Sequence, residues 1–213
     1  MLKENKRTLI ITSILTILPV LIGLFLWNRL PNQMAIHFGM NNEADGFSSK
    51  VFAVFGLPLF LLVMQWFCAL IISRDPRKKN ISPKMFTLVL WIMPFLSLFV
   101  AAIMYSYNLG YQMNISFVSE LLIGMLFIII GNYMPKARQS YTIGIRIPWT
   151  LDNEENWNRT HRLAGYLWVA GGILMLIIAF TGILEFKWML AILLALTLIP
   201  SVYSYLLHVK HGL

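Results

Sequence analysis

Long apolar runs alternate with short polar connections along almost the whole chain. A helix needs roughly 20 apolar residues to cross a bilayer core about 30 Å thick, and six of the runs reach that length. We expect spans at Thr8–Trp27, Val51–Ser73, Met85–Tyr107, Ile115–Tyr133, Gly165–Leu184 and Trp188–Val209. The pattern therefore predicts an all-α integral membrane protein with six transmembrane helices.

Lysine and arginine are concentrated in every second connection. Basic residues near membrane spans are retained on the cytoplasmic side. If the N-terminus is inside, 14 of the 17 lysines and arginines are cytoplasmic, and only Arg29, Lys50 and Lys187 lie outside. The sequence thus predicts a multi-pass protein of the cell membrane, with the N-terminus and C-terminus both cytoplasmic and its basic residues near the anionic headgroups of the lipid bilayer.

Composition agrees with a membrane location. The chain is 58% hydrophobic and 12% charged, whereas about a quarter of the residues in soluble domains are charged. The net charge of +8 is explained by the basic connections, so we expect no direct binding to nucleic acid. Prolines at Pro19, Pro58, Pro94 and Pro200 fall inside four spans, where proline favours a kink.

The longest connection, residues 135–164, has an unusual polar texture. In its first part three isoleucines alternate with Gly144 and Arg146, a period of two that predicts an extended segment ending at Pro148. A helix start follows. Thr150 or Asp152 is a candidate cap for this helix.

Charged and aromatic residues of the new helix recur at helical spacing. Asp152 with Glu155 has the spacing of a capping box, and Glu155 lies one turn before Arg159. Trp157 and His161 share one face of a helix that can continue into the fifth span without a break.

An ordinary explanation exists for each of these residues alone. Trp157 would be an anchor in the headgroup layer, Arg159 and Arg162 would follow the cytoplasmic bias of basic residues, and His161 would be a hydrogen-bonded side chain at the interface.

Taken together, the stretch "IGIRIPWTLDNEENWNRTHRLAG" closely resembles the signature of the SdpI family, multi-span immunity proteins against toxic peptides of the sporulation-delaying type. The resemblance covers Tyr141 to Gly165. The residues that match the family's pattern are Gly144, Arg146, Pro148, Trp149, Thr150, Glu155, Trp157 and His161.

The first external loop, "RLPNQMAIHFGMNNEADGFSSK", carries a second resemblance. Pro31, His37 and Phe38 look like part of the small domain of unknown function that often precedes an SdpI-type half. The two resemblances imply a two-span unit at residues 1–80 with this external loop, followed by a four-span SdpI-type unit at residues 81–213.

The resemblance implies protection of the cell against a membrane-active toxic peptide. It also implies a second role, the sequestration of a small winged-helix repressor at the membrane, through a cytoplasmic surface formed by the second connection and the polar loop. The candidate functional residues of that loop are Arg146, Pro148, Trp149, Thr150, Glu155, Trp157, Arg159, His161 and Arg162. Alternatively, Arg146 and Trp149 organise the cytoplasmic ends of the helices.

One ionisable residue lies inside an expected span. Glu120 is about one turn from the external end of the fourth span, where a charge is costly. It suggests the alternative of a small proton-coupled transporter or exporter. No nucleophile, base or metal-ligand motif is evident, so we expect neither catalytic activity nor a metal or other cofactor.

Overall fold

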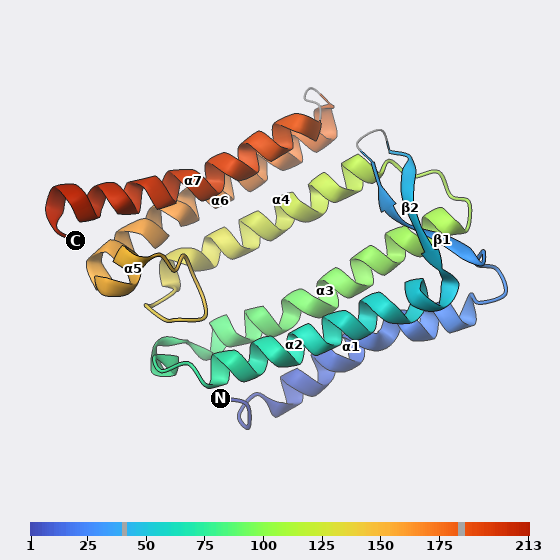
Figure 1. Ribbon diagram of the computed structural model, residues 1–213, viewed down its shortest axis with the longest axis horizontal. Helices are drawn as coiled ribbons and strands as arrows, with labels where there is room; N and C mark the ends of the chain where they lie inside the picture. Colours follow the sequence, from blue (N-terminus) through green and yellow to red (C-terminus); the bar gives the residue numbers. More distant parts are fainter. Residues whose placement is uncertain (40–41, 183–185) are drawn as a thin grey trace. The chain divides into compact units, whose positions relative to one another are not determined.

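The computed structural model describes residues 1–39, 42–182 and 186–213 of the chain (Figure 1). Its α-helices are α1 (Lys6–Phe25), α2 (Leu57–Ser73), α3 (Pro83–Asn108), α4 (Ile115–Tyr133), α5 (Pro148–Asp152), α6 (Glu154–Thr181) and α7 (Phe186–His211). Two strands, β1 (Gln33–Phe38) and β2 (Ala44–Ser49), and three short helical turns, η1 (Phe52–Gly56), η2 (Lys78–Asn80) and η3 (Met134–Lys136), complete the described elements.

Six helices in the described residues are long and apolar enough to cross a membrane, which confirms the predicted number of spans. Five agree closely with the predicted ranges, and α6 begins earlier, at Glu154. The polar loop's helix and the fifth span are therefore one continuous helix, as the helical spacing predicts. The expected end of that span at Leu184 lies outside the described residues.

All four prolines of the apolar runs lie within α-helices. Pro19, Pro94 and Pro200 lie inside α1, α3 and α7 respectively, and each of these helices continues past its proline. Pro58 is the second residue of α2, directly after the π-helical turn η1. Proline lacks the N–H that would close the helical ladder, and at Pro58 a change of helix type precedes the missing donor. The expected kinks stay a prediction.

The contacts of the chain group it into two compact units. Unit 1 comprises residues 1–73 and 83–115, and unit 2 comprises residues 74–82 and 116–213. Helix α3 thus packs with α1 and α2. The division at residues 80 and 81 that the resemblance implies stays a prediction.

In unit 1, α1, α2 and α3 lie side by side (Figure 1) and share a buried polar cluster. The Gln65 amide donates to the Thr12 hydroxyl at 2.6 Å and accepts from Thr16 at 2.8 Å. The Ser97 hydroxyl of α3 donates to the Thr16 carbonyl at 2.7 Å. All four side chains are at most 1% exposed. Hydrogen bonds of this kind hold helices together where burial from water supplies no driving force.

The connection after α1 forms an antiparallel hairpin of β1 and β2, which the sequence interpretation missed. Met34 and Ala35 of β1 are buried against the helices. The Asn108 side chain at the end of α3 accepts from the Ala35 N–H at 2.9 Å and donates to the Ala35 carbonyl at 3.0 Å. The Lys50 ammonium donates to the Trp27 carbonyl at 3.0 Å. The hairpin is therefore anchored to its own unit through β1 and through the residue that follows β2.

In unit 2, glycines bring the backbones of α4 and α6 into contact. A Cβ added at Gly172 would lie 2.6 Å from the Gly124 carbonyl oxygen, and one at Gly165 would lie 2.9 Å from the Gly131 carbonyl oxygen. The other face of α6 receives Leu196 of α7 over Gly171. Small residues permit such close approach of membrane helices, where packing contacts replace burial from water as the source of association.

Gly172→Ala tests this contact. The added methyl would meet the Gly124 carbonyl, which is backbone and cannot rotate away, so we expect a loss of about 2 kcal/mol in the free energy of unfolding, measured by denaturant titration in detergent micelles. Ala170→Leu on the exposed side of α6 is the control and should leave that free energy nearly unchanged. Equal effects of the two substitutions would contradict the packing assigned to α4 and α6.

Candidate functional site

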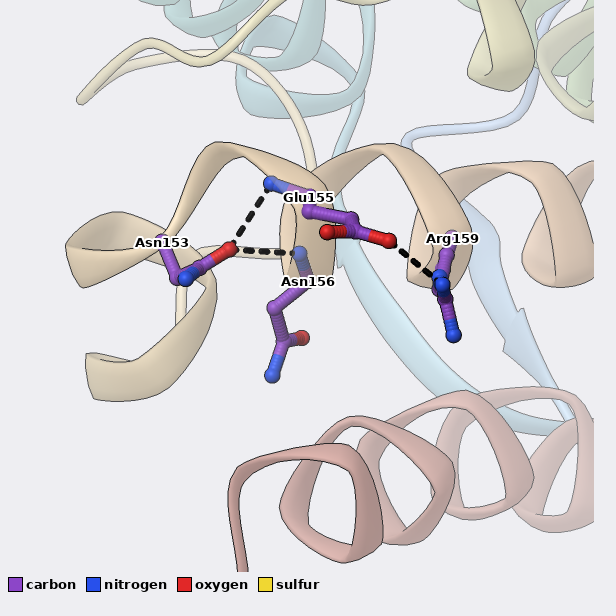
Figure 2. Close-up of polar contacts among 4 residues, drawn as sticks. All are labelled: Asn153, Glu155, Asn156 and Arg159. Carbon is purple, nitrogen blue, oxygen red and sulfur yellow. Dashed lines mark hydrogen bonds and ion pairs between the residues drawn. The ribbon is translucent and has the colours of Figure 1, made fainter. Parts of the chain in front are cut away.

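The polar loop of unit 2 ends where α6 begins, and Asn153 caps that helix (Figure 2). Its Oδ1 accepts from the N–H groups of Glu155 at 2.8 Å and Asn156 at 3.0 Å. The expected caps were wrong, because Thr150 and Asp152 lie within the preceding short helix α5. A side chain can cap α6 only from the residue just before its first turn, and Asn153 occupies that position.

Glu155 and Arg159 form an ion pair one turn apart on the surface of α6, as predicted (Figure 2). Both side chains are about half exposed. Water screens such a pair, so it contributes little to stability.

Thr150 shapes the turn before α5. Its hydroxyl accepts from the Ile147 N–H at 3.1 Å and donates to the Ile145 carbonyl at 2.8 Å, with no exposed surface. Pro148 is the first residue of α5, where the missing N–H of proline has no cost. The extended segment predicted before Pro148 is correct only in part. Ile147 is extended, but the isoleucines form no strand.

Trp157 and His161 form an aromatic platform on which the loop rests. Their rings stack with centroids 4.0 Å apart, one turn from each other on α6. The Trp157 indole N–H donates to the Ala137 carbonyl at 2.7 Å, and His161 Nε2 accepts from the Ile145 N–H at 2.9 Å. His161 Nδ1 lies 2.8 Å from the Trp157 carbonyl and must therefore carry the proton. The imidazole is neutral, with both nitrogens used.

This geometry corrects the expectation for Trp157. A headgroup anchor would be partly exposed, whereas Trp157 has no exposed surface and His161 is 1% exposed. The hydrogen bond to Ala137 draws the indole inward. The platform is thus a structural support of the loop.

Gly144 lies directly on the platform. Its φ of +115° belongs to the region that favours glycine, and a Cβ there would lie 2.4 Å from His161 Nε2 and 2.8 Å from the Trp157 ring. Both its conformation and its contact with the rings require the absence of a side chain.

Asp75, in the connection after α2, holds the start of the loop and was missed in the sequence. It is 3% exposed. Its Oδ1 accepts from the Arg77 N–H at 2.7 Å. Its Oδ2 accepts from the Tyr141 N–H at 3.0 Å and the Thr142 hydroxyl at 2.6 Å. The only signal in the sequence was a single acid within the basic stretch "SRDPRKK".

Gln139 joins the loop to α5. Its side-chain amide donates to the carbonyls of Thr150 at 2.7 Å and Leu151 at 2.9 Å. Asn80 of η2 donates to the Gln139 carbonyl at 2.8 Å. Backbone groups of an irregular loop need such partners when they are buried.

The remaining residues predicted for the loop differ in exposure. Arg146 and Arg162 are exposed. The Arg146 guanidinium donates to the Tyr141 carbonyl at 2.8 Å. Trp149 packs on α7, with ring centroids 5.3 Å from Tyr205 and 6.0 Å from His208. Within the described residues its indole Nε1 is buried without a hydrogen-bond partner.

The residues predicted outside the polar loop belong to other parts of the fold. Pro31 is exposed just before β1, His37 pairs with Asp45 across the hairpin, and Phe38 packs edge-on against Tyr107 of α3 at 4.7 Å. These contacts lie in unit 1. Glu120 lies on α4 and is 7% exposed. Among the described residues, no group of three acidic, histidine or cysteine side chains could hold a metal ion.

Six long apolar helices and a side-chain-braced polar loop define a multi-pass protein of the cell membrane. The model of the SdpI/YfhL protein family matches residues 136–204, and that of a domain of unknown function, DUF1648, matches residues 14–62. The chain is 28% identical over 200 residues to the immunity protein SdpI of Bacillus subtilis strain 168, covering 92% of this chain and 91% of that protein. No solved structure matches. These matches confirm the resemblance that the polar loop and the connection after the first span indicated.

Gly144→Ala should release the loop from the platform, because its methyl would enter the space of His161 Nε2. We expect faster tryptic cleavage after Arg138 and Arg146 in detergent-solubilised protein. Gly110→Ala is the matched control, since Gly110 also has a positive φ, of 89°, but a Cβ there would meet nothing within 4 Å. Unchanged cleavage in Gly144→Ala would contradict the assigned contact.

Asp75→Asn should loosen the same loop from its other side. The substitution replaces one carboxylate oxygen by a donor, so at least one of the three hydrogen bonds is lost. We expect a loss of about 2 kcal/mol in the free energy of unfolding. The exposed Asp152→Asn should have almost no effect, and equal stability of the two variants would be the contrary result.

Proposed function

We propose that this protein is a membrane immunity protein, which protects the cell that carries it against a toxic membrane-active peptide. The observation that supports this most is the braced loop. The matched SdpI/YfhL segment, residues 136–204, contains the platform, its bound loop and the cap of α6. The likeness to an immunity protein extends over nearly the full length of both chains.

The exposure of the loop residues suggests a division of roles. Thr150, Trp157 and His161 are buried and hydrogen-bonded to the loop, so they act as supports. Arg146 and Arg162 are exposed and available to a partner. We infer that the loop motif maintains a fixed surface.

The orientation belongs to the same proposal. With 14 of the 17 basic residues on one side, the termini and the braced loop are cytoplasmic and the hairpin faces outward. A peptide arriving from outside then meets the hairpin of unit 1 first. Protection is passive, by capture of the peptide before it permeabilises the bilayer.

Measurement of membrane potential with a voltage-sensitive dye tests the proposal. Sensitive cells expressing the intact protein should keep their potential when challenged with a sporulation-delaying-type peptide, and cells expressing Gly144→Ala at equal membrane level should lose it. Gly110→Ala is the control and should protect. Equal collapse with the intact protein and with an empty vector would contradict the immunity function.

Glu120→Gln distinguishes passive protection from proton-coupled export. The substitution removes the proton-binding carboxylate from α4 while keeping its size. Passive capture predicts unchanged protection in the same dye assay. Loss of protection at equal membrane level would favour the transporter.

A cytoplasmic winged-helix repressor is the second partner that we propose. Unit 2 carries exposed cations in both of the connections that form this surface and in the first turns of α6, at Arg74, Lys78, Lys79, Arg138, Arg146 and Arg162. Such a surface suits an acidic patch on a protein partner. Replacement of Arg146 and Arg162 by glutamate should reduce the amount of repressor that sediments with membranes. If the amount of sedimenting repressor does not depend on these charges, the proposed sequestration of a repressor is contradicted.

A further inference from the structure

The hairpin of unit 1 has one strand edge without a strand partner among the described residues. Strands β1 and β2 form a two-stranded sheet. The outer edge of β1 is occupied at Ala35, whose N–H and C=O both bond to the Asn108 side chain. Strand β2 has β1 as its only strand partner in the described residues.

The register shows which backbone groups face this open edge. Pairs in an antiparallel ladder alternate between those that exchange hydrogen bonds and those whose N–H and C=O groups point away from each other. The Lys50 N–H donates to the Asn32 carbonyl, so the next pair, Gln33–Ser49, does not exchange hydrogen bonds. By the alternation, the pair Ala35–Phe47 does not exchange them either. The bonds from Ala35 to Asn108 agree with this assignment. Phe47 therefore directs its N–H and its C=O away from β1, and Ser49 directs its N–H away from β1. The Ser49 carbonyl instead serves the first turn of the helix that begins at Lys50.

The surroundings of the edge are apolar and exposed. Phe47 is 61% exposed. Val51 and Phe52, just after β2, are 58% and 60% exposed and begin the second apolar span, so the edge of β2 adjoins the lipid-facing start of that span. Soluble proteins usually block such an edge with lysine or proline. Residues 44–49 contain neither, and their only charged residue is Asp45, which is paired with His37.

We propose that the open edge of β2 binds the toxic peptide as an added strand, with an extended apolar segment of the peptide pairing with both backbone groups of Phe47 and with the N–H of Ser49. The hairpin suits this role because its other side is held by buried Met34, Ala35 and the Asn108 clamp, so the edge is ordered before the peptide arrives. Backbone hydrogen bonds supply affinity in strand addition, and neighbouring side chains supply selectivity. This inference rests on the proposed immunity function.

Phe47→Pro tests the pairing directly. Proline at position 47 removes the outward N–H without removing a donor of the β1–β2 ladder. Phe47→Thr is the matched control, because it loses the aromatic ring but keeps the N–H and suits a strand. In the dye assay we expect the peptide concentration for half-depolarisation to fall about tenfold in Phe47→Pro and much less in Phe47→Thr, at equal membrane level.

The outcomes separate the two proposals. If the intact protein protects and Phe47→Pro protects equally, strand addition is overturned while immunity stands. If the intact protein fails to protect, the immunity function itself is contradicted.

A cross-linking measurement tests the same proposal without relying on correct folding of the proline variant. Phe47→Cys in a Cys68→Ala background is placed in proteoliposomes with a cysteine-bearing form of the same peptide and a mild oxidant. A mixed disulfide between protein and peptide supports the inference. A disulfide between two copies of the protein would assign the edge to a second copy, and no disulfide would mean that the edge is unused; both results overturn it.

Discussion

The stacked rings of Trp157 and His161 carry the polar loop of unit 2. One ring donates to the Ala137 carbonyl and the other accepts from the Ile145 N–H, so the platform grips the loop at two points eight residues apart in the sequence. Gly144 can lie between those points only because it has no side chain. The neutral state of His161 follows from the same contact, since a protonated Nε2 could not accept the Ile145 N–H. Loss of either hydrogen bond would leave a buried backbone group without a partner.

Around the platform, side chains replace the regular hydrogen bonds that a helix or strand would supply. Asp75 accepts from N–H groups of two different connections, at Arg77 and Tyr141. Gln139 satisfies two carbonyls of α5, and Thr150 closes the turn that leads into α5. In hydrocarbon a regular helix satisfies its own backbone N–H and C=O groups. The irregular loop satisfies them through polar residues that would otherwise be unexpected in so apolar a chain. The polar cluster around Gln65 in unit 1 has a different role, because its side-chain hydrogen bonds join regular helices to one another.

The spans could be predicted from sequence because length and hydropathy alone fix which segments can cross a bilayer. The family resemblance was also visible, since it depends on residue identities in one stretch. The roles of those residues were not. The sequence alone does not distinguish Trp157 as a headgroup anchor from Trp157 as a buried support. Only the hydrogen bond from its indole to the Ala137 carbonyl does so. Asn153 was passed over as a cap because the end of α5 was not foreseen.

The contacts between distant segments were equally hidden. The pairing of Asp75 with Tyr141 and of Asn108 with Ala35 joins residues far apart in the chain. The hairpin has few β-branched residues, so its alternation was weak. Gly124 and Gly131 on α4, and Gly165 and Gly172 on α6, do repeat at a common spacing that places them on one face of each helix. That spacing was the one available signal for the α4–α6 contact.

Amide hydrogen exchange of residues 137–147, followed by mass spectrometry on the protein in lipid nanodiscs, tests the central claim most directly. If the platform holds the loop, the Ile145 N–H and its neighbours exchange slowly, like helical amides, and Trp157→Phe accelerates that exchange while leaving α3 unchanged. Exchange of the intact loop at the rate of an unstructured peptide would contradict the account.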